Sequence, residues 1–154
     1  MNASYTKMAN KILKIITVEN KRDEKFLRQK TVSFDFKKHD RKEITELIKQ
    51  MREVMKIAQG VGLSANQLGL NLRVFVAQLP ILRQGSEGQA IESTSTKFYA
   101  IFNPEIIKFS KEKIIMEEGC LSVPGVAGLV ERPEKITLIG QDKNGKKIKI
   151  KAWG

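Results

Sequence analysis

The sequence has few of the residues that form covalent cross-links or bind metals. Among 154 residues it contains one cysteine, Cys120, and one histidine, His39. A single cysteine excludes an intrachain disulfide and suits a reducing compartment. Long hydrophobic runs are also missing: lysines at positions 7, 11 and 14 interrupt the apolar residues of segment 1–20, which excludes a signal peptide and a membrane span there. We expect a soluble cytoplasmic protein with no membrane partner.

Acidic side chains are scarce relative to basic ones. The 17 Asp and Glu residues stand against 28 Lys and Arg, which gives a net charge of +11. Such a charge attracts nucleic acid or another anionic surface without selecting a sequence. Aromatic residues make up only 6% of the chain, and it has no zinc-finger spacing, helix-turn-helix pattern or aromatic RNA-binding signature. The basic residues therefore indicate either a solvated surface or a functional patch, and no specific nucleic-acid motif.

The residues that are present indicate one α+β domain spanning residues 1–154. The clearest element is an amphipathic helix over residues 41–58, where apolar side chains recur every three or four positions. Asp40 and Glu43 are spaced as a capping box at its start, and Gly60 is expected to stop it. We predict that antiparallel strands pack against this N-terminal helix.

From Leu72 the apolar residues alternate with other residues, as in a strand with one buried face. Further strands are predicted at residues 98–102, 113–117, 126–131, 135–140 and 146–151. The last two are expected to form a hairpin around a turn at residues 142–145, with lysines on its solvent-exposed face. Residues 80–96 lack sustained periodicity and are rich in Gly, Ser and Thr, which predicts a mobile loop.

Two short segments contain residues suited to chemistry. The first, GVGLSANQ at residues 60–67, joins the helix to the strand from Leu72. Its glycines allow close backbone approach to a ligand, and Gln67 can both donate and accept hydrogen bonds. The alternative interpretation is a glycine that ends the helix, followed by an ordinary turn.

The second segment, EEGCLSVPG at residues 117–125, contains the only cysteine. A free cysteine in a protein is often a small buried hydrophobic residue. A thiolate joined by two imidazoles would instead form a three-ligand metal site with an open position for water. The residues alone leave both interpretations open.

Together, GVGLSANQ and EEGCLSVPG resemble two of the three signature motifs of the peptide deformylase family. The resemblance extends through KILKIIT at 11–17, LRQK at 27–30, FNPEI at 102–106, VERPEKI at 130–136 and the final hairpin. Members remove the formyl group from the N-terminal formyl-methionine of nascent polypeptides, in the bacterial cytoplasm or in organelles. They use a divalent metal, Fe²⁺ in many members and Zn²⁺ or Ni²⁺ in others.

The resemblance implies roles for individual residues. Cys120 corresponds to the thiolate metal ligand, while the Gln67 side chain and the Leu121 backbone amide correspond to the donors that stabilise the oxyanion. The residues implied to bind the peptide substrate are Val61, Gly62, Met116 and Gly119, with Met116 in the pocket for the methionine side chain. Glu118 and Arg132 are implied to form a buried or half-buried structural pair that orders the cysteine strand.

The sequence departs from the family pattern at its third motif. No HExxH is present, although that motif supplies two histidine ligands and the catalytic glutamate from one helical face. His39 lies in the polar run KKHDR and is expected to be a solvated surface residue. Ser64 stands where many members have alanine, which we expect to be harmless. At Ala127 some members place an arginine, so a side-chain contact to the peptide is in doubt there.

The leading expectation is a deformylase-type domain truncated before its metal-binding helix, with little metal binding and no activity of its own. One alternative is a non-catalytic binding protein for the formyl-methionyl nascent peptide or, through the basic surface, for the ribosome. Another is a gene fragment or an incomplete record.

Overall fold

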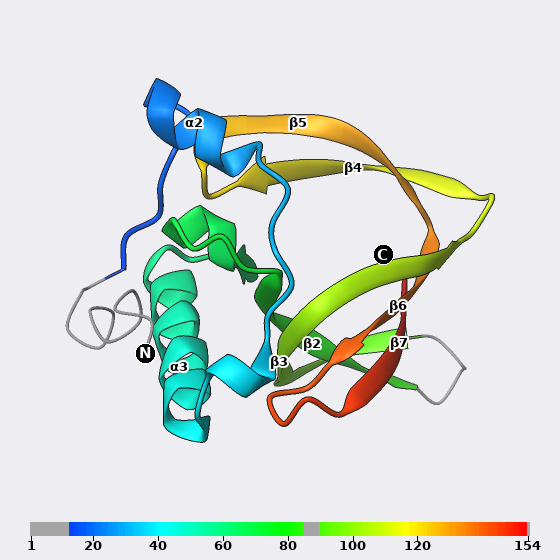
Figure 1. Cartoon of the computed structure of the whole chain (residues 1–154). Helices are drawn as coiled ribbons and strands as arrows, with labels where there is room; N and C mark the ends of the chain where they lie inside the picture. The colour runs from blue at the N-terminus through cyan, green and yellow to red at the C-terminus, as the bar shows by residue number, and fades with distance from the viewer. Residues whose placement is uncertain (1–12, 85–89, 154) are drawn as a thin grey trace.

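The computed structural model describes residues 13–84 and 90–153, and for residues 82–84 and 90–94 it describes the backbone alone. In chain order (Figure 1), the elements are α2 (Lys21–Leu27), η1 (Phe36–Lys38), α3 (Arg41–Ile57), β1 (Gly62–Ser64), η2 (Ala65–Leu68), β2 (Val74–Gln84), β3 (Ala90–Phe109), β4 (Lys113–Cys120), β5 (Val123–Pro133), β6 (Lys135–Gln141) and β7 (Lys147–Trp153). The predicted α+β class is confirmed.

Helix α3 forms where the apolar periodicity predicted it. Both halves of the capping box are present: the Glu43 backbone N–H donates to Asp40 Oδ1 at 2.8 Å, and the Asp40 N–H donates to Glu43 Oε2 at 3.0 Å. The predicted stop is wrong in detail. The left-handed residue is Gln59, with φ of 56°, and the following Gly60 donates its N–H to the Met55 carbonyl at 2.9 Å. The end of the helix therefore does not explain why residue 60 is a glycine.

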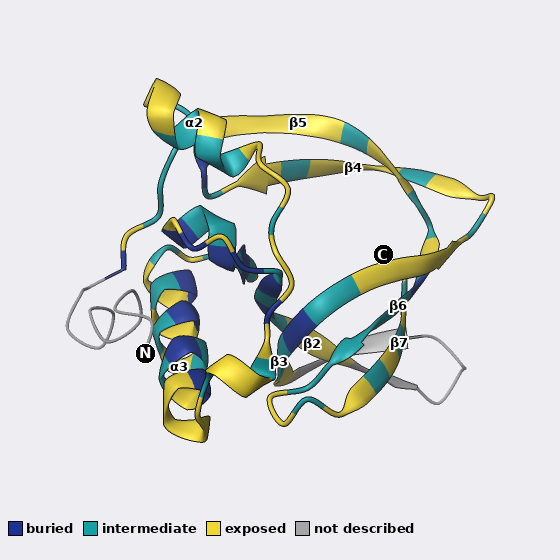
Figure 2. Cartoon of the chain, in the orientation of Figure 1, coloured by how far each residue is buried: buried dark blue, intermediate teal, exposed yellow. Residues whose placement is uncertain are grey.

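The hydrophobic core lies between α3 and the first strands. Met51 and Met55 of α3 are 0% and 1% exposed, and they belong to the same cluster as Val76 of β2 and Phe102 of β3. Figure 2 shows this burial concentrated on the side of α3 that faces the strands. Burial of these side chains removes apolar surface from water and holds the helix on the sheet.

The strands form a five-stranded sheet and a separate ribbon. The sheet has the order β1-β2-β3-β6-β7, and β4 pairs only with β5 in a two-stranded ribbon. Each of these pairs is antiparallel. The predicted strands at residues 98–102, 113–117, 126–131, 135–140 and 146–151 are confirmed within β3, β4, β5, β6 and β7, although most are longer than predicted.

The mobile loop predicted at residues 80–96 is wrong for the part that the structure describes. β2 extends to Gln84 and β3 begins at Ala90, and their pairing reaches Gln84 opposite Ala90. A register shift lies between Pro80 and Leu82. Antiparallel pairing depends on backbone hydrogen bonds, which do not require a regular apolar alternation in the sequence. Residues 85–89 lie outside the described residues.

The hairpin of β6 and β7 forms as predicted. Asp142 accepts backbone hydrogen bonds from Asn144 at 2.8 Å and from Lys146 at 2.9 Å. The Gly145 N–H donates to the Asp142 carbonyl, and Gly145 has φ of 77°, which favours glycine. The two backbone donors lower the pKa of Asp142 below its ordinary value.

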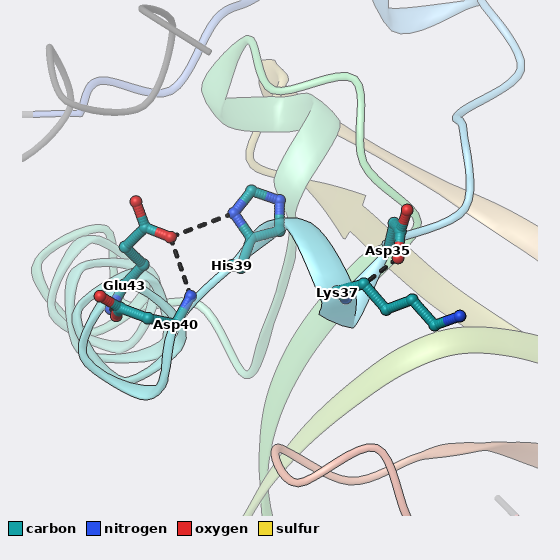
Figure 3. A network of polar contacts seen from close by, with 5 residues as sticks. All are labelled: Asp35, Lys37, His39, Asp40 and Glu43. Atoms are coloured by element: carbon teal, nitrogen blue, oxygen red, sulfur yellow. Dashed lines mark hydrogen bonds and ion pairs between the residues drawn. The ribbon is translucent and has the colours of Figure 1, made fainter. Parts of the chain in front are cut away.

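The prediction that His39 is a solvated surface residue is wrong. Its side chain is 9% exposed and its ring stacks on Phe34 with centroids 4.6 Å apart. Nδ1 lies 3.4 Å from Glu43 Oε2, the oxygen that also accepts from the Asp40 backbone (Figure 3). The polar neighbours of His39 in the sequence gave no sign of its stacking on Phe34, which forms only in the folded chain.

Candidate functional site

The Gln67 side chain is fixed by Ser64. Ser64 donates to Gln67 Oε1 from its backbone N–H and from its hydroxyl, both at 3.0 Å. Because the oxygen is held on this side, the NH₂ group points away from it. Gln67 Nε2 lies 3.2 Å from Ser122 Oγ and 3.7 Å from Cys120 Sγ. The two segments that the sequence singled out therefore meet at the amide of Gln67.

Cys120 is a free, exposed thiol at the end of β4. The interpretation of this residue as a small buried hydrophobe is wrong. Its neighbour Ser122 is 3% exposed, and the Ser122 carbonyl accepts the Val18 backbone N–H at 2.9 Å. The segment after the thiol is thus anchored in the fold, while Cys120 itself is exposed.

Leu121 connects the cysteine segment to the glycine-rich segment. Its side chain packs against the hydrophobic core and lies over Gly60, where an added Cβ would be 2.6 Å from Leu121 Cδ1. A side chain at position 60 would displace Leu121 from this position. Close packing of the two segments, rather than the helix end, accounts for glycine at position 60.

The other residues implied to bind substrate lie on two strands. Gly62 begins β1, which is an edge strand of the five-stranded sheet, and Val61 just before it is 70% exposed. Gly119 is exposed on β4, next to Cys120. Met116 is 36% exposed, and strand alternation places it on the same face of β4 as Glu118. The structure brings Gln67 and Cys120 together, with Leu121 next to Cys120 in the chain, while Met116 lies four residues before Cys120 on β4.

Glu118 of β4 and Arg132 of β5 form a diagonal ion pair, since Arg132 is opposite Ile114 and Glu118 is opposite Gly128. Arg132 donates from Nε and Nη2 to the two Glu118 oxygens at 2.8 and 2.7 Å. These hydrogen bonds lower the pKa of Glu118 and raise the pKa of Arg132. The pair is more exposed than expected, since the Arg132 side chain is 55% and the Glu118 side chain 31% exposed.

The described residues do not fit a three-ligand metal centre by themselves. No group of three or more His, Cys, Asp or Glu side chains within the described ranges could hold a metal ion. His39 is stacked on Phe34 at the start of α3, while Cys120 ends β4. The described residues thus supply one soft donor atom, the Cys120 sulfur, next to the neutral side-chain amide of Gln67.

Sequence reasoning missed two participants. Ser64 was expected to be a harmless replacement for alanine, yet its hydroxyl holds Gln67. Ser122 was given no role, yet it accepts a hydrogen bond from Gln67. The signal for Ser64 was its position three residues before Gln67, the spacing of a capping box.

Comparison with known proteins supports a single family. The family model described as polypeptide deformylase matches residues 12–154. A peptide deformylase of Chloroflexus aurantiacus is 33% identical over 144 residues, covering 93% of this chain and 75% of that protein. A peptide deformylase of Halothermothrix orenii is 42% identical over 113 residues, covering 73% of this chain and 64% of that protein.

Solved structures agree with the sequence relatives. A probable peptide deformylase from Synechococcus phage S-SSM7 matches with a TM-score of 0.74 and 38% identity, covering 92% of this chain and 84% of that one. A peptide deformylase from Acinetobacter baumannii, solved with Met-Ala-Ser bound, matches with a TM-score of 0.75 and 27% identity, covering 94% and 85%. By its sequence match, its fold and its relatives, this chain belongs to the peptide deformylase family.

Proposed function

We propose that this chain binds the N-formylmethionyl end of nascent polypeptides, at a site formed by Gln67, Cys120 and the segment after it. The observation that carries the proposal is the position of the Gln67 amide, which is locked by Ser64 and directed at the cysteine segment. A fixed N–H donor is suited to a carbonyl oxygen that gains negative charge when the formyl carbon is attacked.

The peptide would lie along β1. Because β1 is an edge strand, the backbone groups on its open side can pair with an extended peptide, and such pairing tolerates many side chains. Val61 and Gly62 would line this path, and Gly119 on β4 would allow close approach of the substrate backbone. Met116, which is 36% exposed on β4, would contact the methionine side chain. The structure of a relative with Met-Ala-Ser bound supports a peptide of this kind as ligand.

Hydrolysis demands more than these residues. Peptide deformylases are generally metal-dependent, and Cys120 is the one residue of this chain that corresponds to a family ligand. An ion such as Fe²⁺, Zn²⁺ or Ni²⁺ would need two further protein ligands, and the reaction would need a general base. We therefore propose that the 154 residues alone bind formyl-methionyl peptides without releasing formate. Such a protein would act on new chains in the bacterial cytoplasm or in an organelle, during co-translational N-terminal processing.

A turnover assay tests the catalytic half of this proposal. The 154-residue chain is incubated with formyl-Met-Ala-Ser and Fe²⁺, Ni²⁺ or Zn²⁺, and formate is measured. The expected result is no formate above the level given by metal and peptide alone. Formate release that depends on metal and is lost in Cys120→Ala would show that this chain completes a metal site, and it would overturn the proposal of binding without hydrolysis.

A further inference from the structure

The edge strand β7 has two different faces. Exposed and half-buried residues alternate along Lys147–Trp153, as the alternating colours of β7 in Figure 2 show. Lys147, Lys149, Lys151 and Trp153 therefore project to one side, while the isoleucines and the alanine between them project to the other. Trp153 is 64% exposed. Three lysines and an aromatic ring thus form a single row of exposed side chains along β7.

Neighbouring strands extend this row into a surface. Lys108 of β3 is opposite Thr137 of β6, which is opposite Lys151, and Lys135 is opposite Trp153. Directly paired residues share a face of the sheet. We call this surface the β7 lysine face; it comprises Lys108, Lys135, Lys147, Lys149, Lys151 and Trp153. By the same register this side of the sheet also carries Glu105, opposite Ile139 and Lys149, and two buried residues: Thr137, and Phe102 opposite Gln141 and Lys147. The exposed lysines therefore lie around these buried positions.

The charge of this region is concentrated and mostly unpaired. Residues 135–153 contain six lysines and one acidic residue, Asp142, so they contribute +5 to the net charge of +11. Asp142 is engaged by backbone N–H groups of the turn. In the described part of the chain, the ion pairs include Lys135 with Glu134 at 3.4 Å but none of Lys108, Lys147, Lys149 or Lys151.

Protection of an edge strand explains only part of this pattern. Lysines on an edge strand discourage unwanted strand pairing, which accounts for the three on β7. It does not account for Lys108, which lies on β3 inside the sheet. Nor does it account for Trp153, because an exposed tryptophan on an edge favours association. The combination of lysines and an exposed aromatic ring is suited to a ligand that carries both negative charge and flat apolar rings.

We propose that the β7 lysine face binds single-stranded nucleic acid, independently of the proposed peptide site. Lysines two positions apart on a strand are about 7 Å apart, so the row can follow the sugar–phosphate backbone of a single strand. Trp153 at its end offers a ring on which a base can stack. A membrane surface fits less well, since interfacial binding needs a buried apolar face beside the charges and Trp153 is the one strongly exposed apolar side chain of this face.

Fluorescence anisotropy with a labelled oligouridylate of about 12 nucleotides tests the proposal, because such a length spans a typical single-strand site. The triple variant Lys147→Gln, Lys149→Gln, Lys151→Gln is expected to bind the oligonucleotide at least about tenfold more weakly. The slope of log affinity against log salt concentration is expected to become less steep by about 2. The matched control, Lys42→Gln, Lys49→Gln, Lys56→Gln, removes three exposed lysines from α3. It is expected to change affinity by less than about threefold, since it alters only long-range charge.

Trp153 provides a second readout that does not depend on any variant folding. It is the only tryptophan of the chain, so intrinsic fluorescence of the wild-type protein reports directly on this face. Saturating RNA or DNA oligonucleotide is expected to quench it, whereas anionic phospholipid vesicles of equal phosphate concentration are not. Equal weakening by both triple variants, unquenched Trp153 at saturation, or tighter binding to vesicles than to oligonucleotide would each overturn the proposal.

Discussion

Gln67 and Cys120 are 53 positions apart in the sequence, yet the amide nitrogen of one lies 3.7 Å from the sulfur of the other. Gln67 comes from the short helix η2 that follows β1, and Cys120 comes from the end of β4. Because β4 belongs to the separate ribbon, the contact joins the ribbon to the segment that leads into the five-stranded sheet. A hydrogen-bond donor and a thiol from different parts of the fold thus share one location, on which the proposed function depends.

The Ser64 hydroxyl should stabilise the fold and hold Gln67 in place. Ser64→Ala removes one of the two donors to Gln67 Oε1. Urea unfolding should show a loss of about 1 kcal/mol, the usual net contribution of one hydrogen bond. In NMR spectra the Gln67 side-chain amide signals should shift and exchange faster with water. Ser64→Thr keeps the hydroxyl and serves as the control; unchanged Gln67 signals in Ser64→Ala would contradict the role assigned to Ser64.

Cys120 should react readily in the native protein. The thiol is exposed, so a chromogenic disulfide reagent should modify it at a rate close to that of the urea-unfolded chain. The modified protein should lose its affinity for formyl-Met-Ala-Ser, because the added group would occupy the space beside Gln67. Cys120→Ser, which cannot be modified, is the control. A thiol that reacts only after unfolding would place Cys120 in the interior and contradict this description of the site.

Acid should weaken the β6–β7 turn through Asp142. Its pKa is lowered in the folded chain by the N–H groups of Asn144 and Lys146, so its contribution is present above the ordinary value of 3.8 and is lost as pH falls below it. Thermal unfolding from about pH 5 to about pH 2 should show a smaller decline in melting temperature for Asp142→Asn, which accepts the same hydrogen bonds without titrating. Equal declines for both proteins would exclude Asp142 as a source of acid sensitivity.

Helix α3 should be sensitive to substitution only on the face that packs against the strands. Met51 is 0% exposed, so Met51→Ala should lower the free energy of unfolding by about 2 to 5 kcal/mol, as measured by urea denaturation. Ile57 on the same helix is 84% exposed. Ile57→Ala is the matched control and should change stability by no more than about 0.5 kcal/mol. Similar losses for the two variants would contradict the placement of the core.

Local patterns in the sequence were sufficient for much of this fold. Three features depend on residues only a few positions apart, so their physical causes are visible in the sequence. They are the capping box of α3, the turn from Asp142 to Gly145 and the strand alternation of β7. The short elements α2, η1, η2 and β1 were not predicted, because they are too short for periodicity to show.

Contacts between distant residues were the part that sequence reasoning could not supply. The side chain of Asn103 donates to the Phe34 carbonyl and accepts the Phe34 backbone N–H, a bridge over 69 positions that no local pattern predicts. His39 was misjudged for the same reason, since its stacking on Phe34 depends on the fold rather than on its polar neighbours. The site motifs could be located by resemblance, but the hydrogen bond from Gln67 to Ser122, 55 positions away, depends on the fold.

The most direct test of the proposed site is the preference of this chain for a formylated peptide. Isothermal titration should compare formyl-Met-Ala-Ser with Met-Ala-Ser, for the wild-type protein and for Gln67→Leu. We expect the wild type to bind the formylated peptide more tightly and Gln67→Leu to lose about fivefold in affinity for that peptide alone, since one hydrogen bond to the formyl oxygen is removed. Equal affinity of the wild type for the two peptides would contradict the assignment of Gln67 and Cys120 to a formyl-peptide site.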